Sequence, residues 1–204
     1  MIAALLLAAG SARRFGAPKL LQQLEGRPLV RWSAEWLCGA PVDEIVIVVP
    51  EEHDAIRRAL AGLDARFVVN PHADRGMGSS IACGVSALAP GTTAALIALA
   101  DEPMAGRAAL LRTVERYEAG DVSIVAPTYR GVSGHPVLFD RSTFDELLAL
   151  SGDRGARAVV ERDPGRVAVV EMNETQPIDV DTPADLARVT VQAQYMSLTP
   201  SKLP

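Results

Sequence analysis

Glycines and basic side chains alternate in residues 7–19, which read Leu-Ala-Ala-Gly-Ser-Ala-Arg-Arg-Phe-Gly-Ala-Pro-Lys. Gly10 and Gly16 permit a tight loop whose backbone N–H groups can approach phosphate oxygens closely. Arg14 and Lys19 add positive charge to such a loop. The spacing matches neither a Walker A loop nor the GxGxxG dinucleotide fingerprint. An ordinary turn with solvated arginines is the alternative, but glycines combined with cations favour a phosphate-binding loop.

Lysine is rare in this chain, which makes Lys19 informative. Lys and Arg together number 20, yet the lysines are only Lys19 and Lys202. A GC-rich coding bias accounts for a general preference for arginine. Against that background, an interior lysine indicates that a compact ammonium is needed rather than a planar guanidinium.

A candidate metal ligand follows the apolar run 94–100. Asp101 lies in the segment Ala100-Asp101-Glu102-Pro103, at the C-terminal end of a predicted buried strand. A carboxylate at that position faces the ligand crevice of an α/β protein and can hold Mg²⁺ on a triphosphate. The alternative is a turn or cap residue, which is the usual role of an aspartate after a strand.

A second candidate binding segment follows the predicted strand at 66–69. Asn70-Pro71 comes first, and residues 76–80, Gly-Met-Gly-Ser-Ser, then open a helix. Free N–H groups at that helix end suit an anion or a carbonyl group of a base. A plain glycine turn capped by Ser79 explains the pattern equally well.

Short apolar runs alternate with amphipathic segments along the whole chain. The predicted strands are 2–8, 44–49, 66–69, 94–100, 122–126, 136–139 and 167–171. The predicted helices are 28–38, 51–61, 79–88, 107–118, 141–150, 156–162 and 183–194. Their β-branched content and length suit strands buried on both faces, and Thr182 suits the N-cap of the last helix. This alternation predicts an α/β fold with a mostly parallel sheet covered by helices.

Composition limits the class of protein further. The chain of 204 residues predicts a single domain over 1–194 and a flexible tail over 195–204. A net charge of -5 and an aromatic content of 4% argue against a nucleic-acid surface. Cys38 and Cys83 lack CxxC spacing, so we expect small buried residues in a reducing compartment. The apolar run 2–9 is too short to cross a membrane, and we expect a soluble cytoplasmic protein without membrane contact.

In these motifs the chain resembles the MobA/MocA-like nucleotidyltransferases, and the nearest pattern is that of the molybdenum cofactor cytidylyltransferases. The resemblance follows the order of the motifs over most of residues 1–192. It implies a Rossmann-like three-layer α/β/α fold of the nucleotide-diphospho-sugar transferase type. It also implies that Lys19 and Arg14 act on the phosphates as catalytic cations. The remaining loop residues that it assigns to the nucleotide are Leu7, Ala8, Ala9, Gly10 and Gly16.

The resemblance extends to the nucleoside and the metal. It assigns the nucleoside pocket to Asn70, Gly78, Ser79 and Ser80. It assigns Mg²⁺ to Asp101 and to a second carboxylate in the segment Val180-Asp181-Thr182-Pro183. Asp181 is the choice there because it directly precedes Thr-Pro, and Asp179 is the second candidate. Pure helix capping remains the alternative for Asp181.

Two further segments resemble the family's GHP and GDxGAR motifs. They are Gly134-His135-Pro136 and residues 152–157, Gly-Asp-Arg-Gly-Ala-Arg. The resemblance assigns His135, Asp153 and Arg157 to the acceptor. A histidine satisfied by backbone groups is the alternative for His135, and a helix partner is the alternative for Arg157. His53 and His72 receive no role.

The activity implied by the resemblance is a Mg²⁺-dependent transfer of CMP from CTP to molybdopterin, with release of pyrophosphate. A molybdenum hydroxylase would then receive the product. Cytosine is favoured because the chain has Leu-Ala-Ala-Gly where guanylyl relatives carry Leu-Ala-Gly-Gly, and the Ala9 methyl narrows the pocket. Other triphosphates and other phosphorylated acceptors remain open. The alternatives are an NAD(P)H-dependent oxidoreductase on this scaffold, despite the missing GxGxxG, and a non-catalytic chaperone of the cofactor.

Overall fold

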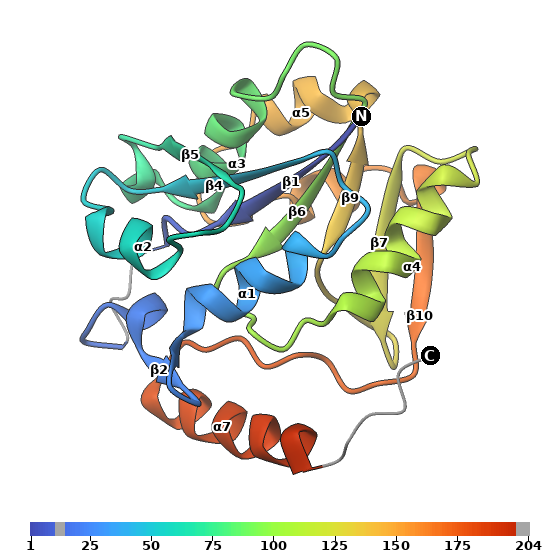
Figure 1. Ribbon diagram of the computed structural model, residues 1–204. Helices are drawn as coiled ribbons and strands as arrows, with labels where there is room; N and C mark the ends of the chain where they lie inside the picture. The colour runs from blue at the N-terminus through green and yellow to red at the C-terminus, as the bar shows by residue number, and fades with distance from the viewer. Residues whose placement is uncertain (11–14, 199–204) are drawn as a thin grey trace.

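The computed structural model describes the backbone of residues 1–10 and 15–198 (Figure 1). Its main feature is an 8-stranded sheet in the order β10-β7-β9-β6-β1-β4-β5, with β8 paired to β7. The strands are β1 (Ile2–Leu7), β4 (Glu44–Val49), β5 (Arg66–Val69), β6 (Ala94–Leu99), β7 (Ile124–Tyr129), β8 (Val132–Ser133), β9 (Val137–Asp140) and β10 (Val167–Met172). A separate hairpin pairs β2 (Gln23–Leu24) with β3 (Arg27–Pro28). The predicted α/β class is confirmed.

The centre of the sheet is parallel and apolar. Leu5 of β1 pairs with Val46 of β4 and with Ile97 of β6. Every residue of β1 and β6 is buried, because helices cover both faces of these strands. The edge strands differ: Val169 of β10 is 57% exposed, so burial on both faces was wrongly predicted there.

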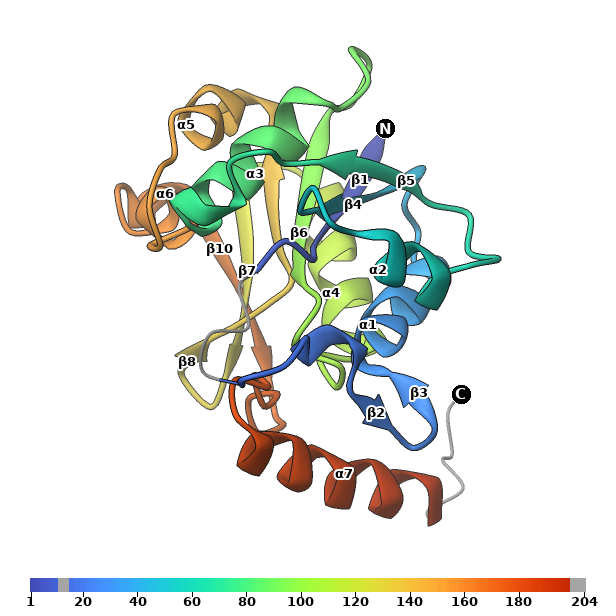
Figure 2. The same cartoon turned by 90° about the vertical axis from the view of Figure 1, so that its left-hand side faces the viewer.

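Helices cover both faces of the sheet, as the two views show (Figures 1 and 2). One face packs against α1 (Leu29–Cys38), α2 (Asp54–Ala59) and α4 (Arg107–Glu118). The other face packs against α3 (Met77–Ser86), α5 (Phe144–Leu148) and α6 (Arg157–Val160). The last helix, α7 (Pro183–Leu198), lies outside these layers and packs on the β2–β3 hairpin.

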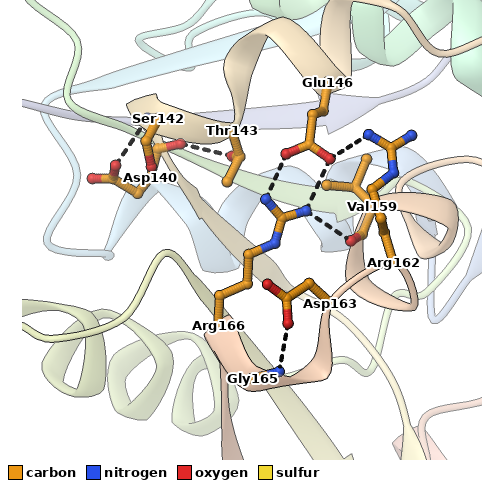
Figure 3. A network of polar contacts seen from close by, with 9 residues as sticks. All are labelled: Asp140, Ser142, Thr143, Glu146, Val159, Arg162, Asp163, Gly165 and Arg166. Atoms are coloured by element: carbon orange, nitrogen blue, oxygen red, sulfur yellow. Dashed lines mark hydrogen bonds and ion pairs between the residues drawn. The ribbon is translucent and has the colours of Figure 1, made fainter.

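The short helix α5 is tied to the segment that enters β10 (Figure 3). The Glu146 carboxylate accepts hydrogen bonds from Arg166, and from Arg162 at 2.6 Å. Arg166 also donates to the carbonyl of Val159 in α6 at 3.2 Å. This network joins α5, α6 and β10, and so fixes both ends of the loop that follows α5.

Several boundaries differ from the prediction. The helix predicted over 141–150 begins as a 3-10 turn (Arg141–Thr143), and α7 continues past Gln194 to Leu198. Thr182 caps α7 as predicted, in a capping box in which its N–H donates to Asp185 Oδ2 at 2.9 Å. Cys38 is exposed and Cys83 is half-buried, so their predicted burial was wrong. Cys38 is the last residue of α1, where the chain leaves the core.

Among the helices that the structure describes, none combines the length and the hydropathy needed to cross a membrane.

Candidate functional site

A cavity of about 530 Å³ opens at the C-terminal ends of β1 and β6. Parallel strands place their following loops at this edge of the sheet, where α/β proteins bind ligands. The walls come from the loop after β1, the start of α3, the end of β6 and the loop after α5. The lining residues are Leu7, Ala9, Gly10, Ala73, Asp74, Gly76, Met77, Ser80, Leu99, Asp101 and Asp153.

Three carboxylates meet beside this cavity. Asp101 follows β6, and its carbonyl accepts a hydrogen bond from the Val180 N–H at 3.0 Å. This contact brings Asp179 and Asp181 alongside Asp101, although they are far apart in sequence. One oxygen from each of the three carboxylates lies within 4.8 Å of the others. Such a set of hard oxygen ligands suits Mg²⁺ or Mn²⁺.

At the start of α7, the Asp181 side chain contacts Lys19. The cap of α7 is formed by Thr182 and Asp185, whose carboxylate accepts from the Thr182 hydroxyl at 2.7 Å. Asp179 is exposed but lies among like charges. Two effects raise the pKa of Asp179 to about 7. The larger is the partial loss of hydration of its carboxylate, and the second is repulsion from the charges of Asp101 and Asp181. A cation bound between the three carboxylates would relieve that repulsion.

Lys19 lies between two of these carboxylates rather than facing open solvent. Its ammonium Nζ is 2.6 Å from Asp101 Oδ2 and 3.0 Å from Asp181 Oδ1. The residue belongs to a short 3-10 turn and is only 6% exposed. Burial alone would lower the pKa of Lys19, but the ion pairs with Asp101 and Asp181 outweigh it and raise that pKa. Arg14, the other predicted phosphate ligand, lies outside the described residues.

The predicted loop residues divide between the cavity and the core. Leu7, Ala9 and Gly10 line the cavity. Ala8 is buried, and its N–H donates to the carbonyl of Val48 at 2.8 Å, so it holds the loop to β4. Gly16 has a φ of 72°, a conformation that glycine adopts readily.

Among the residues predicted to bind the nucleoside, Ser80 lines the cavity and its neighbours support it. Asn70 is 2% exposed, and its side-chain amide donates to the hydroxyls of Ser79 and Ser80, each at 3.0 Å. Asn70 therefore positions the two serines. The Ser79 hydroxyl donates locally to the carbonyl of His72 at 2.7 Å.

Gly78 serves close packing of α3 against the loop after α5. Its N–H donates to the carbonyl of Gly152 at 2.8 Å. A Cβ at Gly78 would lie 2.8 Å from the backbone of Ser151, which is too close for any other residue. The glycine thus lets the loop that carries Asp153 reach the cavity.

The residues predicted to bind the acceptor are only partly brought together. Asp153 lines the cavity next to Gly76. Arg157 projects from α6 with a side chain 80% exposed, and it pairs with Glu161 at 2.6 Å. Arg157 thus has the helix partner of the alternative interpretation, and its assignment to the acceptor stays a prediction.

His135 is held by a residue that the sequence did not single out. Its ring Nδ1 lies 2.9 Å from Oε1 of Glu102, whose side chain is only 8% exposed. Burial alone would lower the pKa of His135, but the hydrogen bond and charge of Glu102 raise it. Tyr129 donates its hydroxyl to the carbonyl of His135 at 3.0 Å. The feature of the sequence that could have pointed to Glu102 is its position as an acidic residue directly after Asp101.

Comparison with known proteins places this site in a family. A family model described as the MobA-like NTP transferase domain matches residues 4–167. Nicotine blue oxidoreductase of Paenarthrobacter nicotinovorans is 32% identical over 199 residues, covering 92% of this chain and 96% of the relative. Purine catabolism protein PucB of Bacillus subtilis is 28% identical over 189 residues, covering 88% of this chain and 91% of the relative. The structure of Rv0371c from Mycobacterium tuberculosis, in complex with manganese, has a TM-score of 0.81 and 27% identity. The match covers 93% of this chain and 98% of that chain.

The match of the family model spans the predicted phosphate loop, the predicted nucleoside segment, Asp101 and the loop that carries Asp153. The architecture agrees, since the mostly parallel sheet is that of the nucleotide-diphospho-sugar transferase fold. The chain therefore belongs to the MobA-like NTP transferase domain family and is one of its nucleotidyltransferase enzymes.

Proposed function

We propose that this enzyme transfers CMP from CTP to molybdopterin in a Mg²⁺-dependent reaction and releases pyrophosphate. The observation that carries the proposal is the meeting of a nucleotide-sized cavity with Asp101, Asp179 and Asp181 at the ends of β1 and β6. The product would serve a molybdenum hydroxylase in the cytoplasm.

The donor set fits a divalent cation. Asp101 and Asp181 would hold it, with Asp179 within reach, and these ligands already attract one cation, the Lys19 ammonium. When bound, the ion would supply charge neutralisation at the triphosphate. The structure of the similar protein Rv0371c was solved in complex with manganese, which supports the use of a divalent ion.

In the proposed reaction, a phosphate oxygen of the acceptor attacks the α-phosphorus in line with the leaving group. The new bond joins that oxygen to phosphorus, and the bond to pyrophosphate breaks. Positioning and charge neutralisation carry such a step, without a covalent protein intermediate. Among the described residues, those that line the cavity include Asp74, Asp101 and Asp153 but neither Lys nor Arg. The positive charge that stabilises the departing pyrophosphate would therefore come from cations next to the cavity, namely Lys19 and the predicted phosphate ligand Arg14.

Different residues would select the base and bind the acceptor. The Ala9 methyl narrows the cavity beside the predicted base, and Ser80 offers a hydroxyl there, which supports cytosine. His135, whose pKa is raised by the hydrogen bond and charge of Glu102, would hydrogen-bond the acceptor phosphate.

A second candidate function is an NAD(P)H-dependent oxidoreductase, and the relative named nicotine blue oxidoreductase favours it. The three carboxylates and the buried lysine suit a metal-bound triphosphate better, because hydride transfer does not need them. A cofactor chaperone would need neither the three carboxylates nor the buried lysine.

Thermal unfolding in the presence of Mg²⁺ and each of CTP, GTP, ATP, UTP, NADH and NADPH tests the proposal. A ligand that binds only the folded state raises the melting temperature. We expect the largest rise with Mg²⁺ and CTP together. A rise with NADH or NADPH alone, and with no triphosphate, would replace the proposal with the oxidoreductase.

A further inference from the structure

The buried Lys19 ammonium shares its partners with the proposed metal. Nζ contacts the Oδ2 of Asp101 and the Oδ1 of Asp181 at 2.6 and 3.0 Å. These are oxygens of the two carboxylates that would bridge a divalent ion. A cation that bridges the two carboxylates through these oxygens would compete with Nζ for them.

We propose that Lys19 holds the metal site of the empty enzyme and exchanges with the divalent cation only when a triphosphate is present. The proposal rests on the proposed nucleotidyl transfer. It makes cation binding conditional on the nucleotide.

The reason is the cost of leaving Lys19 without a counter-ion. A free divalent ion bound to both carboxylates would leave the ammonium of Lys19, a residue that is only 6% exposed, without a counter-ion. Breaking a buried ion pair in this way is strongly unfavourable, because the remaining charge has lost both water and partner. A metal ion arriving alone therefore binds weakly.

A metal ion arriving with a triphosphate meets a different situation. The β- and γ-phosphates offer new partners for the displaced ammonium, and the flexible lysine stem can swing toward them. Lys19 directly follows the predicted phosphate loop, in which Gly10 and Gly16 permit close approach. Metal and nucleotide then strengthen each other's binding by an equal factor, as linkage requires.

The first test compares wild type with Lys19→Met, using Mn²⁺ and CTP as probes and the acceptor omitted. Without CTP, we expect the variant to bind Mn²⁺ at least about tenfold more tightly, measured by electron paramagnetic resonance. At saturating Mn²⁺, we expect it to bind CTP at least about tenfold more weakly, measured by calorimetry. Arg116→Met removes another ion-paired cation, beside Asp121, and should change neither affinity.

Two results would overturn the exchange. An unchanged Mn²⁺ affinity in Lys19→Met would mean that lysine and metal occupy separate places. An unchanged CTP affinity would mean that Lys19 never reaches the phosphates.

A second measurement uses the wild-type protein and so does not depend on a folded variant. With two lysines in the chain, lysine labelled with ¹³C at Cε gives two NMR signals, and Lys202 serves as the internal reference. The Lys19 signal should move when Mg²⁺ and CTP are added together, and much less with Mg²⁺ alone. A static Lys19 signal while CTP binds would refute the exchange. If no triphosphate binds, the proposed function is wrong, and the Mn²⁺ comparison alone still decides whether lysine and metal compete.

Discussion

At the scale of single residues, the site depends on side chains that their neighbours hold in place. Asp101 is fixed through its backbone by Val180 and through its carboxylate by Lys19. Ser80 is fixed by Asn70, and His135 by Glu102. A substitution that keeps size but removes one function should therefore change activity with little effect on the fold.

Asp101→Asn is the most direct of these substitutions. The amide has the same shape but is a poor ligand for Mg²⁺, so transfer should fall at least about a hundredfold, roughly 2.7 kcal/mol in the barrier. Pyrophosphate release at saturating Mg²⁺ measures turnover, and circular dichroism checks the fold. Asp121→Asn, at an exposed surface pair, is the matched control. Wild-type turnover in Asp101→Asn would remove this carboxylate from the mechanism.

Ala9→Gly tests the choice of base. Removing the methyl from the cavity wall should relax the preference for CTP toward GTP, with little loss of CTP use. One methyl in a pocket changes discrimination by about 1–3 kcal/mol, so the shift should be partial. The measurement is the ratio of kcat/KM for CTP and GTP. If that ratio stays the same, the base is selected elsewhere, for example at Ser80.

Glu102→Gln tests how His135 is held. The carboxylate raises the pKa of His135, so the amide should lower it, which NMR titration of the three histidines can follow. Because the folded-state pKa is raised, the stabilisation from this pair is full below the ordinary histidine pKa of about 6.5. It is lost as the pH rises through the folded-state value. We also expect a higher KM for the acceptor and an unchanged affinity for CTP; a histidine pKa that does not move would leave Glu102 a packing residue.

At the scale of elements, the network in Figure 3 joins α5 to α6 and to the segment that enters β10. Glu146→Gln should lower the free energy of unfolding by about 1–3 kcal/mol, because it leaves the half-buried Arg166 without its charged partner. Hydrogen bonds from Arg166 hold the pKa of Glu146 below its usual range. The stabilisation is therefore full above the ordinary glutamate pKa of about 4.3, and it is lost as the pH falls through the lower folded-state value.

Urea unfolding of wild type and Glu146→Gln at several pH values measures this contribution. Glu161→Gln is the control, since Glu161 also accepts from two arginines but lies at the surface. A difference between wild type and Glu146→Gln that persists in strong acid would contradict an ionic origin.

The sequence predicted those elements whose pattern is local. β1 and β6 are continuous apolar runs because both faces are buried, and the amphipathic α4 was predicted with its observed bounds. The β2–β3 hairpin was missed because two-residue strands carry no periodicity. The antiparallel pairing of β9 between β6 and β7 depends on tertiary contacts that no local pattern encodes.

The distinction between local patterns and contacts of distant segments also applies to the candidate site. Asp101 was predicted from its strand, and residues of the phosphate loop from their glycines and cations. Asp181, with Asp179 as the second candidate, was expected beside Asp101 from the family resemblance alone, because no local pattern encodes the backbone hydrogen bond that joins these distant segments. The ion pairs of Lys19 and the pairing of Glu102 with His135 likewise join residues far apart in sequence. Arg157 was assigned from the motif, but α6 turns it to solvent.

At the scale of the whole molecule, the question is which reaction this scaffold carries out. The fold serves both nucleotidyltransferases and a relative named as an oxidoreductase, so the fold alone does not decide. The net charge of -5 makes a bound cation and Lys19 important for attracting a triphosphate into an acidic site. The reaction is therefore identified by which nucleotide is transferred and which acceptor receives it.

Transfer of labelled CMP is the most direct measurement. The enzyme is incubated with CTP labelled at the α-phosphate, Mg²⁺ and molybdopterin carrying molybdenum, and the products are separated by chromatography. We predict that label enters a cytosine dinucleotide form of the cofactor, with one pyrophosphate released per transfer. CTP should be used in preference to GTP, and omission of Mg²⁺ should stop the reaction. Oxidation of NADH or NADPH by an electron acceptor, with no transfer of label from any triphosphate, would contradict the account.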